Sequence, residues 1–134
     1  MCANPVVSEL LRAGQAIPVC PEVLGGLGIP RPPAEIKGGD GLDVLEGKAR
    51  VINSRGEDVT DQYVTGARVS LAIALQAGCS KAILKARSPS CGAGVIYDGT
   101  FAHARVIGDG VLAALLRRHG VDVKTDEEVT ALSL

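Results

Sequence analysis

The sequence predicts an α/β domain in which helices cover both faces of a parallel sheet. Segments of strand length alternate with segments of helical periodicity, and glycine-rich turns separate them. Residues 81–85 contain a continuous apolar run, which is typical of a central parallel strand. Of the 134 residues, 46% are hydrophobic and 22% are charged, so the chain 1–134 is expected to fold as one domain around one core.

The first half of the chain is expected to hold short elements. A helix is predicted over 4–14, where an asparagine can cap it and a glycine can end it. A short strand follows over 16–19. Prolines and glycines in 21–37 exclude long regular structure, apart from a short turn. Residues 43–53 alternate between apolar and polar side chains, which predicts a small hairpin or an extended excursion.

The middle of the chain contains the longest predicted helix, over 62–77, with Thr60 or Asp61 as its cap. The apolar strand over 81–85 comes next, and a polar loop over 86–94 follows it. This order of helix, strand and loop is the unit from which a parallel sheet is built, with right-handed crossovers between its strands.

The last part of the chain is expected to complete the sheet. Asp109 is predicted to cap a helix over 111–119, whose leucines face inward. A strand over 121–123 follows, and Thr125 is expected to cap a short helix that runs to Glu128.

Composition excludes several classes of partner. The net charge of −1 provides no basic surface for nucleic acid or anionic lipid, and 2% aromatic residues with no Trp provide no platform for stacking bases. No apolar run approaches the roughly 18 to 20 residues of a membrane span, and the N-terminus does not resemble a signal peptide. We expect a cytoplasmic protein that binds a small molecule, without nucleic acid or membrane partners.

Two cysteines are predicted to meet at one edge of the sheet. Ligands of parallel sheets bind beyond the carboxyl ends of the strands. Cys20 directly follows one predicted strand, and Cys91 lies in the loop after another. Cys79 instead precedes a strand and belongs to the opposite edge, while the position of Cys2 is not determined by this reasoning. We therefore expect Cys20 and Cys91 to act in metal binding or catalysis, and Cys2 and Cys79 to be small buried hydrophobes.

Polar residues beside these two cysteines suit chemistry at sulfur or a metal. Glu22 could act as a general base, although a solvated loop charge is an equally good interpretation. The hydroxyls of Ser88 and Ser90 and the amide of Gly92 could bind an oxyanion or sulfide. Arg87 could stabilise a nearby thiolate, or it could only solubilise the end of the strand.

A weaker alternative makes Cys91 a nucleophile that is activated by loop amides and Arg87. It requires a base nearby, and neither histidine has a sequence reason to be that base.

Three segments of the sequence resemble a bacterial family long catalogued as of unknown function, which includes the thiouracil desulfidases. The three segments are Pro18 to Leu27, which contains Cys-Pro-Glu; Pro30 to Ile36; and Leu84 to Gly92, which contains Ser-Pro-Ser-Cys-Gly. The resemblance also includes the string Tyr97 to Phe101 and the glycine–aspartate turns at 38–41 and 108–110, so that it spans nearly the whole chain.

The resemblance implies a Rossmann-like domain with an oxygen-sensitive [4Fe–4S] cluster on three cysteines. The open iron would take sulfur from a thiolated substrate such as 2-thiouracil, which is hydrolysed to uracil with release of sulfide. It implies Cys20 and Cys91 as cluster ligands, Glu22 as the catalytic acid–base and Ser88 as a site serine.

The chain departs from the family at its start. The family opens with a strand that carries the first cysteine, and the chain is expected to lack this N-terminal strand; Cys2 falls at a later position, where the family has no ligand. Two thiolates alone should hold a cluster poorly. The alternative function is therefore a non-catalytic domain that binds a small molecule or anion, or an N-terminally truncated, inactive paralogue. A domain without this strand would expose apolar surface, which favours a homo-oligomer.

Overall fold

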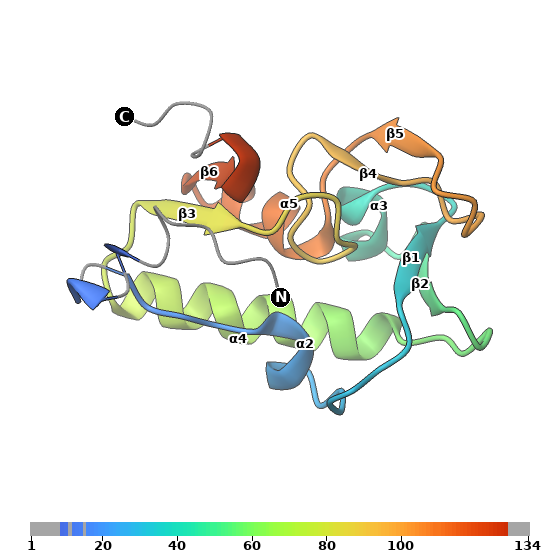
Figure 1. Cartoon of the computed structure of the whole chain (residues 1–134), viewed down its shortest axis with the longest axis horizontal. Coiled ribbons are helices and arrows are strands. Elements are labelled where there is room, and N and C mark those ends of the chain that lie inside the picture. The colour runs from blue at the N-terminus through green and yellow to red at the C-terminus, as the bar shows by residue number, and fades with distance from the viewer. Residues whose placement is uncertain (1–8, 11, 15, 129–134) are drawn as a thin grey trace.

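The strands of the protein form three separate pairs, as seen in a computed structural model that describes residues 9–10, 12–14 and 16–128 (Figure 1). One pair is parallel, β3 with β6, and two are antiparallel, β1 with β2 and β4 with β5. The strands are β1 (Ala34–Lys37), β2 (Arg50–Asn53), β3 (Lys81–Leu84), β4 (Val95–Tyr97), β5 (Arg105–Ile107) and β6 (Asp122–Thr125). The α/β class is confirmed, with its parallel pairing at β3 and β6.

Within residues 16–128, four helices pack around these pairs. They are α2 (Pro21–Leu24), α3 (Gly41–Leu45), α4 (Thr60–Gln76) and α5 (Val111–Arg118). In Figure 1 the long helix α4 runs below β3, and α2 lies across it. Helix α5 packs against α3, α4 and β6 and so occupies the centre of the molecule.

The core gathers around α5. Six consecutive residues of this helix, from Val111 to Leu116, are buried, because neighbouring elements cover it on several sides. Ile36 and Val51 from the β1–β2 pair and Ile96 from β4 complete the most deeply buried set. The N-terminus of α5 is therefore held firmly inside the structure, which matters for the loop that it supports.

Most of the later predictions are confirmed. The structure contains the long helix as α4, the apolar strand as β3 and the last strand as β6. It also has the inward-facing leucines of α5 and a reciprocal cap between Thr125 and Glu128: each backbone amide donates to the other's side chain at 3.0 Å. Of the helix predicted over 4–14, residues 9, 10 and 12 are helical, and residues 4–8 and 11 lie outside the described part of the chain.

Two predictions for the first half are wrong. Residues 16–19 do not form a strand, since strand structure requires a paired neighbour and no described residue pairs with them. In 43–53, only the second part is extended, as β2. The first part is the end of α3, because Asp40 and Asp43 form a reciprocal capping box that starts a helix.

Two predicted caps and one hairpin also differ. Neither Thr60 nor Asp61 caps α4, which begins after Val59; the Thr60 hydroxyl instead accepts from the Val51 amide at 2.8 Å. Helix α5 begins after Gly110, and Asp109 binds the loop amide of Gly94 at 2.8 Å. The β4–β5 pair has no prediction to match, because three-residue strands are too short to show an alternating pattern.

Candidate functional site

Cys20 and Glu22 lie together at the start of α2. Cys20 is the N-cap residue, and Pro21 suits the first helical position because its missing N–H needs no partner there. The Cys20 thiol donates to Glu22 Oε2 at 3.5 Å. Glu22 in the first turn also favours the positive end of the helix. The turn thus places a carboxylate directly against a thiol.

Arg31, from the loop before β1, contacts both groups. Its Nη2 donates to Glu22 Oε2 at 3.3 Å and to Cys20 Sγ at 3.7 Å, and its Nη1 donates to the carbonyl of Gly28 at 3.3 Å. The Glu22 side chain is 13% exposed and that of Arg31 is 28% exposed, so this ion pair is partly shielded from solvent. Arg31 therefore holds the carboxylate and the sulfur in one arrangement.

Tyr63 on α4 lies close to this group. It is buried on the first turn of α4, the helix on which α2 packs. Burial raises the pKa of the Tyr63 hydroxyl above its ordinary value, and the charge of Glu22 raises it further. The Arg31 guanidinium opposes this rise, while Cys91 and Cys20 add to it, which indicates that both cysteines lie near this phenol.

The second cysteine lies in a tight loop after β3. The Cys91 amide donates to the Ser88 hydroxyl at 2.6 Å, and the Gly92 amide donates to the Ser88 carbonyl at 2.9 Å. Cys91 is 9% exposed and Ser90 is fully buried. The loop is therefore a compact turn, in which Ser88 accepts hydrogen bonds from the amides of Cys91 and Gly92.

Helix α5 supports this loop from beneath. The amides of Gly110, Val111 and Leu112 donate to the carbonyls of Gly92, Pro89 and Ser90 at 2.6, 2.7 and 2.8 Å. The first amides of a helix have no partner within the helix, so the loop carbonyls satisfy them. Because α5 lies inside the core, the position of the Cys91 loop is tied to the core as well.

Glu22 also acts on Cys91. Burial raises the pKa of the Cys91 thiol to about 12, and the Glu22 charge adds to this shift, while the hydroxyls of Ser90 and Ser88 oppose it. Near neutral pH the thiol therefore stays protonated unless a cation binds it. The alternative in which Cys91 is a nucleophile activated by Arg87 is not favoured, because Arg87 forms an ion pair with Glu127 instead.

Ser90 and Gly92 are both closely packed within the loop. The Ser90 hydroxyl is buried and makes no hydrogen bond of normal length within the described residues. A Cβ on Gly92 would lie 2.7 Å from the Ser88 carbonyl oxygen and 2.9 Å from Ile96 Cγ2, so a larger residue does not fit. Sulfide binding by Ser90 and Gly92 stays a prediction.

The other two cysteines, Cys79 and Cys2, are not part of this arrangement in the described structure. Cys79 is half-buried and precedes β3, so it lies at the opposite end of this strand from the Cys91 loop, and its amide donates to the Ala74 carbonyl at 2.9 Å. Cys2 lies outside the described residues.

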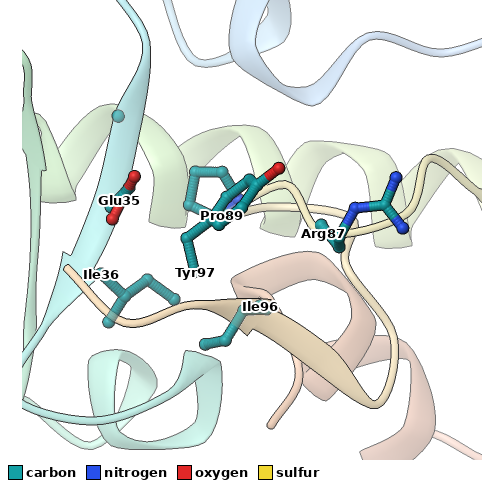
Figure 2. A pocket seen from close by; sticks show the side chains of 7 residues that line it. Glu35, Ile36, Arg87, Pro89, Ile96 and Tyr97 are labelled. Atoms are coloured by element: carbon teal, nitrogen blue, oxygen red, sulfur yellow. The ribbon is translucent and has the colours of Figure 1, made fainter. Parts of the chain in front are cut away.

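A buried carboxylate that sequence reasoning missed supports the neighbouring loop. Glu35 on β1 is 8% exposed, and its Oε1 accepts from the amides of Gly99 at 3.0 Å and Phe101 at 3.1 Å. It lines a closely packed pocket with Pro89 and Tyr97, and the Arg87 guanidinium points away from it (Figure 2). The two amides satisfy this carboxylate, which favours a structural role.

Arg31 and Tyr63 were also missed. Arg31 stood in the Pro-Arg-Pro-Pro string, where charge alone does not distinguish a site residue from a solvated one. Tyr63 falls on a helix face at ordinary core spacing. Neither residue has a sequence signal that points to the cysteines.

The types of donor atom present fit an iron–sulfur site. The two thiols are the kind of ligand that holds an iron–sulfur cluster, and the Glu22 carboxylate could act as a base beside them. Within 9–10, 12–14 and 16–128, however, no group of three His, Cys, Asp or Glu side chains is arranged to hold a metal ion. A third ligand would have to come from beyond this described set. The same residues contain no helix that is long and apolar enough to cross a membrane.

Comparison with known proteins identifies the family. Residues 2–128 match the model of the 2-thiouracil desulfurase family. This chain belongs to the 2-thiouracil desulfurase family. The resemblance seen in the Cys-Pro-Glu and Ser-Pro-Ser-Cys-Gly strings is therefore confirmed.

Two relatives of this desulfurase-family chain are informative. The uncharacterised protein YbbK of Bacillus subtilis (strain 168) is 46% identical over 127 residues, which are 95% of this chain and 84% of YbbK. The solved structure of the [4Fe–4S]-dependent thiouracil desulfidase TudS is 39% identical and superposes with a TM-score of 0.83, covering 98% of this chain and 80% of TudS. The α/β fold is thus that of a thiouracil desulfidase, an iron–sulfur enzyme.

Proposed function

We propose that this protein removes sulfur from a thiolated pyrimidine such as 2-thiouracil by hydrolysis. Water supplies the oxygen that replaces sulfur at the ring carbon, and sulfide leaves with the two protons of that water. The oxidation state of the carbon does not change, so the reaction needs no electron donor or acceptor. The observation that carries the proposal is the position of Glu22, whose carboxylate contacts the Cys20 thiol at 3.5 Å and also raises the pKa of the Cys91 thiol.

The proposed cofactor is a [4Fe–4S] cluster with Cys20 and Cys91 as two of its ligands. Within the described residues no third His, Cys, Asp or Glu joins these two thiols in a metal-binding group. When bound, such a cluster supplies an open iron that acts as a Lewis acid toward sulfur. The support in this chain is that Cys20 lies at the start of α2 in contact with Glu22 and Arg31, and that the first amides of α5 hold the Cys91 loop.

Glu22 is the proposed acid–base residue. Its carboxylate would take a proton from the attacking water and return one to the departing sulfur. Arg31 donates to Glu22 Oε2 and so keeps this oxygen beside the Cys20 sulfur. Shielding of the pair from solvent strengthens this orientation, because charge-assisted hydrogen bonds are stronger where water is excluded.

The loop after β3 is the proposed binding segment. Ser88 would orient the substrate, while Ser90 and Gly92 would contact the sulfide or an oxyanion. The support is that the Ser90 hydroxyl is buried beside Cys91, acts on its thiol, and makes no hydrogen bond of normal length in the described part of the chain, a costly arrangement that functional sites tolerate.

The proposal is tested by anaerobic reconstitution with iron and sulfide. We expect broad visible absorption and sulfide release from 2-thiouracil in the wild type, and loss of both in Cys20→Ser and Cys91→Ser. Cys79→Ser is the matched control and should keep both. Cys2→Ser, measured in parallel, shows whether this thiol supplies the third ligand.

A wild-type protein that folds without iron and releases no sulfide would overturn the proposal. It would support the alternative of a non-catalytic domain, in which Cys20→Ser leaves ligand binding and stability nearly unchanged.

A further inference from the structure

Two acidic residues near the end of the described chain, Asp126 and Glu127, bind the two residues that lead into the Cys91 loop. Arg87 Nη1 and Nη2 donate to Glu127 Oε1 and Oε2 at 2.6 and 2.9 Å, a bidentate pair across 40 positions of sequence. The amide of the preceding residue, Ala86, donates to Asp126 Oδ1 at 3.0 Å. Two adjacent carboxylates thus hold two adjacent residues, and Cys91 follows four positions later.

Arg87 is held in an unfavourable backbone conformation. Its φ of 67° lies in the left-handed region, which is unfavourable for a non-glycine residue. Such a conformation persists only where surrounding contacts require it. Here those contacts are the ion pair with Glu127 and an isolated β-bridge to Ile96. The Arg87 guanidinium also holds the pKa of Glu127 below its ordinary value.

The acidic pair is itself anchored. Thr125, at the end of β6, forms the reciprocal cap with Glu128, so the backbone at 126–127 is fixed on both sides. The ion pair lies in an open groove of about 460 Å³, which is also lined by Arg105.

We propose that Asp126 and Glu127 form a C-terminal clamp that keeps the Cys91 loop closed. Helix α5 fixes the loop from the core side, and the clamp fixes its entry from the solvent side. These carboxylates are positioning residues: they act through Ala86 and Arg87 and do not contact Cys91. That the closed loop serves sulfur removal rests on the proposed function, whereas the clamp itself does not.

The test measures how often the loop opens. The full chain without iron is treated with iodoacetamide under native conditions, and modification of Cys91 and Cys79 is followed by peptide mass spectrometry. Because Cys91 is buried, its modification reports opening of the loop, and Cys79 is an internal reference in each sample. We expect Glu127→Gln and Arg87→Gln each to raise the Cys91 rate about 3- to 10-fold, with the Cys79 rate unchanged.

Two features separate the clamp from simpler effects. If the substitutions acted only through the local electric field, they would change the Cys91 modification rate in opposite directions, because Glu127→Gln removes a negative charge and Arg87→Gln removes a positive one. Loss of the clamp instead raises the Cys91 rate in both variants. The double variant should open no more than either single one, since both remove the same contact. Glu46→Gln is the matched control, because it removes an exposed carboxylate 3.8 Å from Lys48, and should leave the rate unchanged.

An unchanged Cys91 rate, or opposite shifts in the two variants, would overturn the clamp. This result is distinguishable from failure of the proposed function. If the wild type takes up no iron but Glu127→Gln opens the loop, the clamp stands and the desulfidase proposal fails. If the wild type releases sulfide and the rates do not change, only the clamp fails. In reconstituted protein, loss of iron to a chelator should be 3- to 10-fold faster in Glu127→Gln.

Discussion

Gly25 at the end of α2 and Gly66 on α4 bring two backbones into direct contact. A Cβ on Gly25 would overlap the carbonyl oxygen of Gln62, and a Cβ on Gly66 would overlap that of Pro21. The crossing therefore leaves no room for any side chain at either position. Since Pro21 lies between Cys20 and Glu22, this contact sets how close the proposed ligand and base lie to α4.

We expect Gly66→Ala to push α2 away from α4. The overlap should destabilise the protein by about 1–3 kcal/mol, the usual cost of overpacking, and should lower iron uptake because Cys20 moves. Urea unfolding and iron content of reconstituted protein measure the two effects. Gly28→Ala is the control, because a Cβ there meets nothing within 4 Å. Equal stability and iron content in both variants would contradict the role of the crossing.

Arg31→Met should lower sulfide release about 10- to 100-fold, the range seen when residues that orient metal ligands are lost. It removes the hydrogen bonds that hold Glu22 Oε2 and Cys20 Sγ. Arg31→Lys should retain part of the activity, because it keeps the charge but loses the planar donor pair. Steady-state sulfide assays measure both, and exposed Arg55 changed to Met is the control. Full activity in Arg31→Met would show that Glu22 needs no such support.

Ser90→Ala tests whether the unpaired buried hydroxyl has a function. Its removal should leave the free energy of unfolding within about 1 kcal/mol, since no hydrogen bond of normal length is lost, while sulfide release falls about tenfold or more. Ser70→Ala is a matched buried control: its hydroxyl donates to the Gly66 carbonyl at 2.7 Å, so it should cost about 1 kcal/mol without reducing turnover per folded protein. Unchanged sulfide release in Ser90→Ala would remove this residue from the site.

Asp58 should make the free energy of unfolding depend on pH in the acidic range. Hydrogen bonds from Arg50 and Thr60 lower its pKa to about 2, below the value near 3.9 of an unfolded chain. The contribution is therefore complete above about pH 5 and is lost as the pH falls toward 2. Because the carboxylate is 42% exposed, we expect Asp58→Asn to cost only about 0.5–1 kcal/mol at pH 7, and almost nothing near pH 2. Urea titrations at the two pH values measure this, and an equal cost at both would contradict it.

The sequence by itself determined the elements with a strong local pattern. Apolar spacing along 62–77 and 111–119 predicted α4 and α5, and the continuous run at 81–85 predicted β3. The chain order of strands and cysteines also separated Cys79 from Cys91. These predictions succeed because periodicity and chain order are properties of neighbouring residues.

Only the tertiary structure decided which distant groups meet. The approach of Gly25 to Gly66, the contact of Arg31 with Glu22 and the pairing of Arg87 with Glu127 join residues that are 9 to 41 positions apart. Each depends on how helices and loops pack, and packing is determined by the shape of the whole core rather than by local pattern. The failed strand at 16–19 has the same cause, since a strand exists only where another segment pairs with it.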